Sequence, residues 1–202
     1  MISLVGIGTA GENIVGHFRD NKEYNVYVLS DNVVRNSKYK YKIKNCDNIE
    51  EYEDENSGLK LAKFLGTTEG HVQVFLCGSS RTANATLSIL QHIKDKKIDI
   101  FYIQPDTDLL IGVPKLQERA IFSILQTYAR SGLFNSLTVF SNYSIEKTIG
   151  SIPIKKYFDT INQSIYYSVH YKNLFDHTNP VVGNLTVPSE IQRIRSIGRI
   201  NP

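Results

Sequence analysis

The sequence has no tryptophan, one methionine and two cysteines among its 202 residues. Cys46 and Cys77 are too few to build the disulfide framework of a small secreted protein, so we expect reduced thiols and a cytoplasmic location. No apolar run reaches the roughly 20 residues that span a bilayer, and no basic region precedes Ile2 as it would in a signal peptide. A net charge of +3 is too small to indicate a nucleic-acid or membrane partner.

Clusters of catalytic or metal-binding side chains are also lacking. The five histidines are scattered along the chain, at positions 17, 71, 92, 170 and 177. They show neither the spacing of a zinc site nor a Ser-His-Asp arrangement. We therefore predict no metal site and name no catalytic residue.

Short apolar runs of strand length alternate with amphipathic helical segments along the chain. The expected strands are Ile2–Val5, Tyr24–Leu29, Lys38–Lys44 at an edge, Val72–Leu76, Ile98–Ile103 and Leu137–Phe140. The expected helices end near Arg19, Leu65, Ile93, Arg130 and Phe175, the last being the longest. This alternation predicts an α/β protein, a Rossmann-like three-layer sandwich with a mostly parallel sheet.

We expect two parts in the chain. Residues 1–180 would form one nucleotide-binding-like α/β domain that includes the long helix, and residues 181–202 a C-terminal tail. Within the tail, Ile191, Ile194 and Ile197 recur every third residue, which suggests a helix. Such a helix would close this protein's own core or dock on a partner.

The most informative stretch is the glycine-rich turn that follows the first strand. Gly6, Gly8 and Gly11 satisfy G-x-G-x-x-G between a strand and a helix. Glycines let the backbone approach a ligand closely, and a helix N-terminus attracts anions. Asp31 follows Gly11 by 20 residues, where a dinucleotide-binding unit places an acid for the ribose hydroxyls. One reading is therefore an NAD(P)-linked oxidoreductase.

The order of the loops resembles that of the tubulin/FtsZ GTPase family. That family's first loop is G-x-G-G-x-G-x-N, which Gly6, Gly8, Gly11 and Asn13 match, with Thr9 where a glycine is usual. Ser30-Asp31-Asn32 resembles the family's T-D segment after the second strand. The resemblance implies GTP or GDP, with Mg²⁺, as cofactor. The residues it assigns to nucleotide binding in these two loops are Gly6, Gly8, Thr9, Ala10, Gly11, Glu12, Asn13 and Asp31.

The family's second loop, G-G-G-T-G-S-G, resembles Gly78–Asn84 in position, although only one glycine is kept. The resemblance implies phosphate contacts from Gly78, Ser79, Ser80, Arg81 and Thr82. Arg81 would add a charge-assisted contact. The alternative is that the hydroxyl groups cap the following helix and Arg81 faces water.

The long helix and the strand before it resemble the family's base-binding elements. Asn142 stands where the family places an asparagine near the nucleotide, and Phe158 and Asn162 where an aromatic residue stacks on the base and an amide reads guanine. The family's catalytic acid is replaced by Thr186, and Glu190 is poorly placed to substitute. The family's second domain has no counterpart before Pro202.

These observations predict an assembly or scaffold protein that binds guanine nucleotide, or descends from a binder, with weak or lost GTP hydrolysis. We expect self-association or incorporation into a larger protein assembly. Two alternatives stay open: the NAD(P)-linked oxidoreductase, and a non-catalytic structural protein with an empty site, such as a component of a viral particle.

Overall fold

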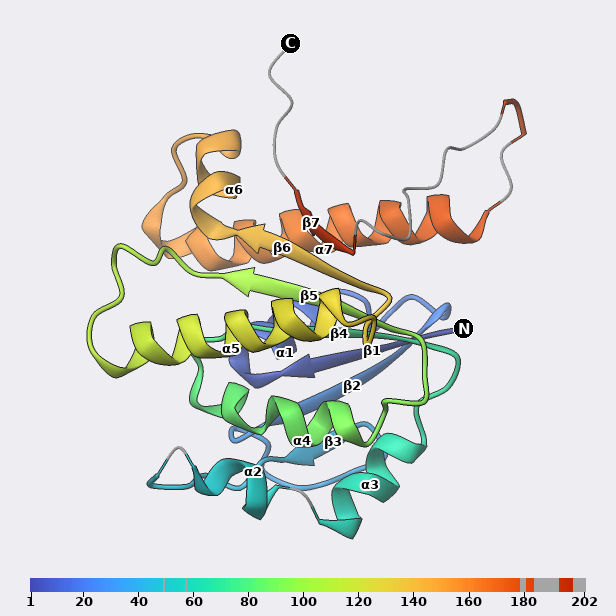
Figure 1. The fold of residues 1–202 in the computed structure, drawn as a ribbon. Coiled ribbons are helices and arrows are strands. Elements are labelled where there is room, and N and C mark those ends of the chain that lie inside the picture. The colour runs from blue at the N-terminus through green and yellow to red at the C-terminus, as the bar shows by residue number, and fades with distance from the viewer. Residues whose placement is uncertain (49, 57, 179–180, 184–192, 198–202) are drawn as a thin grey trace.

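The computed structural model describes the chain except for residues 49, 57, 179–180, 184–192 and 198–202. Its centre is a sheet of seven parallel strands in the order β3-β2-β1-β4-β5-β6-β7 (Figure 1). The strands are β1 (Ile2–Ile7), β2 (Tyr24–Ser30), β3 (Lys40–Lys42), β4 (His71–Leu76), β5 (Ile98–Gln104), β6 (Ser136–Ser141) and β7 (Ile194–Ser196). The predicted α/β class with a parallel sheet is confirmed.

Helices cover both faces of this sheet. The α-helices are α1 (Gly8–Gly16), α2 (Glu51–Glu55), α3 (Leu59–Gly66), α4 (Thr86–Gln91), α5 (Val113–Arg130), α6 (Asn142–Ile149) and α7 (Tyr157–His177). Two 3₁₀ helices, η1 (Arg81–Ala85) and η2 (Ile154–Lys156), precede α4 and α7. None of the helices in the described ranges is long and apolar enough to cross a membrane.

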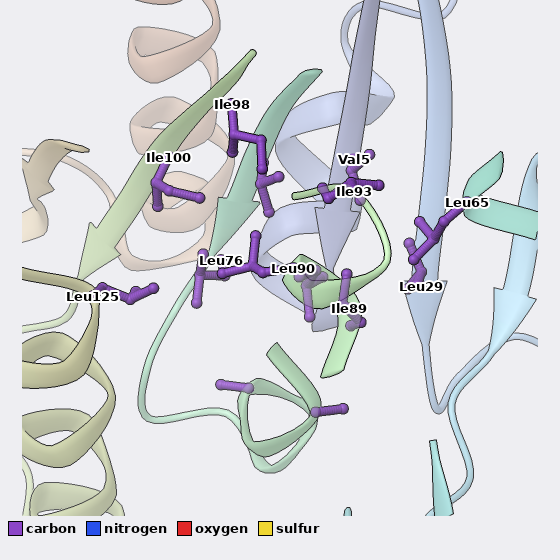
Figure 2. Close-up of a cluster of buried hydrophobic side chains, with 14 of the residues drawn as sticks. Val5, Leu29, Leu65, Leu76, Ile89, Leu90, Ile93, Ile98, Ile100 and Leu125 are labelled. Carbon is purple, nitrogen blue, oxygen red and sulfur yellow. The ribbon is translucent and has the colours of Figure 1, made fainter. Parts of the chain in front are cut away.

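One core layer lies between the sheet and helices α3, α4 and α5, with a contribution from α2. Side chains alternate between the two faces of a strand, so Val72, Val74 and Leu76 of β4 point into this layer and Phe75 into the other. Figure 2 shows the first layer, with Ile89 and Leu90 of α4 in the same cluster as side chains of β1, β2, β4 and β5.

The second core layer lies between the opposite face of the sheet and helices α1 and α7. Ile161, Ile165 and Val169 recur every fourth residue and form the buried stripe of α7. Gln73 and Asp99 are polar, yet they occupy sheet positions that face this apolar layer. Both side chains are held by hydrogen bonds, which offsets the cost of burying them.

The structure differs from the sequence prediction at the end of the first strand and in an additional helix. Gly6 belongs to β1, which continues to Ile7, so the glycine turn is shorter than its sequence pattern indicates. Helix α6 was not predicted, although Ser141 supplies a typical N-cap by accepting a hydrogen bond from Ser144 N at 3.3 Å.

The prediction of a helix in the C-terminal tail is wrong for the tail residues that the structure describes. Residues Ile194–Ser196 form β7, an edge strand whose Ile194 pairs with Leu137 and packs against the first core layer. The three-residue spacing of isoleucines is close to a helical period, but backbone pairing with β6 determines the outcome. Ile191 lies outside the described residues.

Candidate functional site

The loops named by the sequence meet at the edge of the sheet where the strands end, called here the carboxyl edge. The strand order reverses direction at β1, since β2 lies on one side of it and β4 on the other. In open parallel sheets, the crevice beyond the strand ends at such a reversal is the usual ligand site. Helix α1 begins there at Gly8, and the side chain of its N-cap residue, Ile7, makes no hydrogen bond to the free amides.

Gly8 lies at the contact between the first and second loops. Its φ of +69° lies in the left-handed region that favours glycine. A Cβ at this position would lie 2.3 Å from Thr82 Oγ1 and 2.9 Å from Ser80 Oγ. Those two hydroxyl groups are themselves hydrogen-bonded at 2.6 Å. The two predicted phosphate loops are therefore in direct contact, with hydroxyl groups where the resembled family has glycines.

Gly6 and Gly11 have a packing role. A Cβ on Gly6 would lie 2.6 Å from the carbonyl oxygen of Gly11, and a Cβ on Gly11 would lie 2.4 Å from that of Phe75. The missing side chains let α1 approach β1 and β4 closely. The side-chain position of Gly11 thus faces a strand, and a branched residue there would disrupt packing; the predicted role of Gly11 in nucleotide binding stays a prediction.

The second loop leads into η1 instead of directly into an α-helix. Ser80 stands at the N-cap position of η1 but makes no side-chain cap, so the predicted hydroxyl capping is wrong for this residue. Gln117 of α5 donates to the carbonyl oxygens of Gly78 and Ser80 and holds the loop in place. Arg81 is exposed at the loop surface.

The remaining residues of the first loop surround the start of α1. Thr9 is exposed and accepts a hydrogen bond from Asn32 Nδ2 at 3.0 Å, which ties the loop to the end of β2. Glu12 lies 3.7 Å from Lys40 Nζ of β3. Asp31 directly follows β2 and is half-buried, while Ala10 is half-buried in the first turn of α1. Asn13 is exposed one turn further along α1.

Helix α7 runs from the carboxyl edge toward the opposite, amino edge of the sheet. Its Tyr166 packs against Phe18, which follows α1, with ring centres 4.6 Å apart. Two turns later, Asn173 bonds to Gln73 near the start of β4. The first turns of α7 therefore lie toward the carboxyl edge.

Three residues predicted to contact the base lie around this end of α7. Phe158 is 68% exposed, whereas Asn162, one turn later, is only 9% exposed. Asn142 begins α6, and its Oδ1 is buried with no hydrogen-bond partner in the part of the chain that the structure describes. An unsatisfied buried amide oxygen is uncommon and indicates a position that a ligand or water donor would satisfy.

Sequence reasoning missed Tyr102 and Glu118, which lie under the second loop. Tyr102 OH donates to Glu118 Oε1 at 3.1 Å, and both residues are buried. Burial and the adjacent Glu118 carboxylate raise the pKa of Tyr102, and burial also raises the pKa of the Cys77 thiol. Gly78 is required here, because a Cβ would lie 2.1 Å from the Tyr102 hydroxyl.

No protein-family model and no curated protein matches the chain. The solved structures with a similar fold include "FtsZ dimer, empty (M. jannaschii)", with a TM-score of 0.68 and 13% identity, and "FtsZ W319Y mutant, P1 (M. jannaschii)", with a TM-score of 0.62 and 12% identity. Each comparison covers 90% of this chain and 57% or 58% of the FtsZ chain, so the chain spans less than two thirds of these proteins' length. The fold is therefore FtsZ-like. A more distant match is a short-chain dehydrogenase/reductase from Brucella ovis. Its TM-score is 0.46 at 9% identity, over 82% of this chain and 91% of that chain, so it is too dissimilar to support an argument.

Proposed function

We propose that the chain binds a guanine nucleotide at the carboxyl edge and acts as an assembly or scaffold protein with weak or no hydrolysis. The observation that carries this proposal is the uncapped N-terminus of α1, which begins at Gly8 on the reversal point of an FtsZ-like sheet. Free amides at a helix N-terminus favour phosphate. A triphosphate would bring Mg²⁺, which neutralises part of its charge.

We expect different residues around the two loops to bind the phosphates and the base. The amides of residues 8–11 would hold the phosphates from one side, and Ser79 and Arg81 from the other. Phe158 offers an exposed ring for stacking, and Asn142 and Asn162 offer amides for the base edge. A bound base could donate a hydrogen bond to the unpartnered Oδ1 of Asn142 and stack on the exposed ring of Phe158.

Hydrolysis would need a group that activates water, and general-base assistance commonly contributes about 10²–10⁴-fold. Thr186 stands where the resembled family has its catalytic acid, and Glu190 is four residues later; both lie outside the described residues. A threonine hydroxyl is not a base near neutral pH, so we expect little turnover. The FtsZ dimer among the similar folds agrees with assembly as the role.

An NAD(P)-linked oxidoreductase is the second candidate, because Asp31 directly follows β2. At that place in a dinucleotide-binding sheet, an acid accepts hydrogen bonds from the ribose hydroxyls. Asp31 accepts a hydrogen bond at 3.4 Å from Ser30, which leaves acceptor capacity for a ribose.

The test is a nucleotide screen by thermal shift and calorimetry with GTP, GDP, ATP and NAD side by side. A ligand at 100 times its dissociation constant stabilises the fold by about 2.7 kcal/mol. We expect stabilisation by GTP and GDP above that by ATP. Stabilisation by NAD alone would favour the oxidoreductase, and no effect from any of the four would favour the structural protein with an empty site.

A variant at Thr9 tests where the phosphates lie without disturbing the core. Thr9→Glu places a negative charge in the first turn of α1, where it stabilises the helix but repels phosphate. Thr9→Gln is the matched control, since it removes the same hydroxyl and adds no charge. We expect at least about a tenfold loss of GTP affinity in the first variant relative to the second; equal affinities would place the phosphates elsewhere.

A further inference from the structure

A second cavity lies at the amino edge of the sheet, at the opposite end from the nucleotide site. Its volume is about 380 Å³, within the range of small-molecule sites. The residues that line it include Ile2, Glu23, His71, Leu174 and His177. They come from the starts of β1, β2 and β4 and from the end of α7. None of them belongs to the glycine loops.

The imidazole of His71, which lines this cavity, is paired with a buried carboxylate that does not itself line it. Asp99 of β5 is 1% exposed, and its Oδ2 lies 2.8 Å from Nε2 of His71, whose side chain is 11% exposed. Oδ1 of Asp99 accepts hydrogen bonds from Ser136 Oγ at 2.6 Å and Asn135 Nδ2 at 2.7 Å. Burial alone would raise the pKa of Asp99, but His71, Ser136 and Asn135 hold it well below its ordinary value, so the carboxylate is charged.

The charged carboxylate decides which nitrogen of His71 carries the proton. A lone pair on Nε2 would be repelled by the charge of Asp99 Oδ2 at 2.8 Å, which favours the proton of the neutral ring on Nε2. The contact is not aligned as a hydrogen bond, and neither Nε2 nor Oδ2 has a hydrogen-bond partner among the described residues. In the neutral ring the proton cannot also be on Nδ1, which is then an acceptor. That nitrogen is buried and has no hydrogen-bond partner among the described residues. A buried acceptor without a donor costs about 1–3 kcal/mol, which a ligand donor would recover.

The other lining groups indicate an uncharged ligand. Glu23 is exposed to solvent and so adds no buried charge to the cavity. Burial and the neighbouring His71 lower the pKa of His177, whose ring centre is 6.0 Å from that of His71, so His177 is neutral near pH 7. A charged ligand would lose its hydration without a buried counter-ion. Ile2 and Leu174 supply apolar contact.

We infer that this cavity is a second ligand site, which takes a small neutral molecule that presents one O–H or N–H donor from an apolar body to Nδ1 of His71. In the described part of the chain, no group of three or more His, Cys, Asp or Glu side chains could hold a metal ion. The unpaired nitrogen is therefore assigned to an organic donor. This inference does not rest on the nucleotide site, because the two sites lie at opposite edges of the sheet.

A matched pair of probes tests the inference on the full chain without a histidine tag. Phenol and anisole have similar rings, but only phenol donates a hydrogen bond. Nitrogen-15 labelling of the histidine rings lets NMR follow His71 directly during titration with each probe. We expect phenol to shift the His71 Nδ1 resonance and to bind at least about tenfold more tightly than anisole, because a site that hydrogen-bonds a donor rejects an analogue without one.

Two variants separate binding in the cavity from binding elsewhere. Leu174→Trp fills the cavity without altering His71 and should abolish the phenol shift, whereas His17→Gln, at the end of α1, should leave it unchanged. Equal affinities for phenol and anisole would overturn the inference. Persistence of the shift in folded Leu174→Trp, or a micromolar response to Zn²⁺ with none to phenol, would also overturn it.

Discussion

Gln73 and Asn173 exchange two hydrogen bonds across the second core layer, although 100 positions separate them in the chain. Gln73 Nε2 donates to Asn173 Oδ1 at 2.6 Å, and Asn173 Nδ2 donates to Gln73 Oε1 at 2.9 Å. Both side chains are buried, at 0% and 2% exposure. This pair fixes the end of α7 against β4 and thereby sets how the start of α7 reaches the carboxyl edge.

The amide pair predicts strong coupling between its two residues. Gln73→Leu or Asn173→Leu alone leaves a buried amide unsatisfied and should cost about 1–3 kcal/mol of unfolding free energy. The double variant replaces both polar groups and should cost less than the sum of the two. Urea unfolding of the four proteins gives the coupling energy as a double-mutant cycle. Additive losses would show that the two amides act independently.

Acid should destabilise the protein through Asp99 and His177. The folded-state pKa of Asp99 is lowered, so its contribution is present above the unfolded pKa near 4 and is lost as pH falls below it. The pKa of His177 is also lowered, so protonation below about pH 6.5 favours the unfolded chain. We expect Asp99→Asn to cost about 1–3 kcal/mol at pH 7, because it leaves the buried His71 without its carboxylate partner, and less as the pH falls toward 3. Urea midpoints across this range measure the effect; a constant difference would contradict it.

Two glycines of α1 should respond differently to the same substitution. Gly11→Ala places a Cβ 2.4 Å from the Phe75 carbonyl oxygen and should cost about 1–3 kcal/mol, as overpacking does. Gly16→Ala meets no atom within 4 Å and should be neutral or stabilising by about 0.4–1 kcal/mol. Thermal melts of both variants compare them directly. If they melt together, close packing is not the role of Gly11.

Base recognition at α7 can be tested with little risk to the fold. Phe158→Ala removes an exposed ring and should cost about 1–3 kcal/mol of nucleotide binding. Phe175→Ala, on the same helix and 63% exposed, is the matched control and should bind normally.

Asn162→Asp should alter the preference for guanine or abolish binding. Calorimetry with GTP and ATP measures both effects; an unchanged preference would exclude Asn162 as the reader.

The sequence by itself determined the fold class and the place of the first loop. Both depend on local pattern: apolar runs of strand length, helical periodicity, and glycines between a strand and a helix. Asn142, Phe158 and Asn162 were named by position alone, and their roles stay predictions.

The tertiary structure alone decided how distant residues meet. Gly11 faces Phe75, and Asp99 meets a histidine 28 positions away, because strands separated in the chain become neighbours in the sheet. The isoleucines of the tail have a helical spacing, yet Ile194 is in a strand because β6 offered an unpaired edge. A local pattern indicates which face of a helix or strand is buried. It does not indicate which backbone or charged group lies opposite that face, because this depends on packing between segments that are distant in the chain.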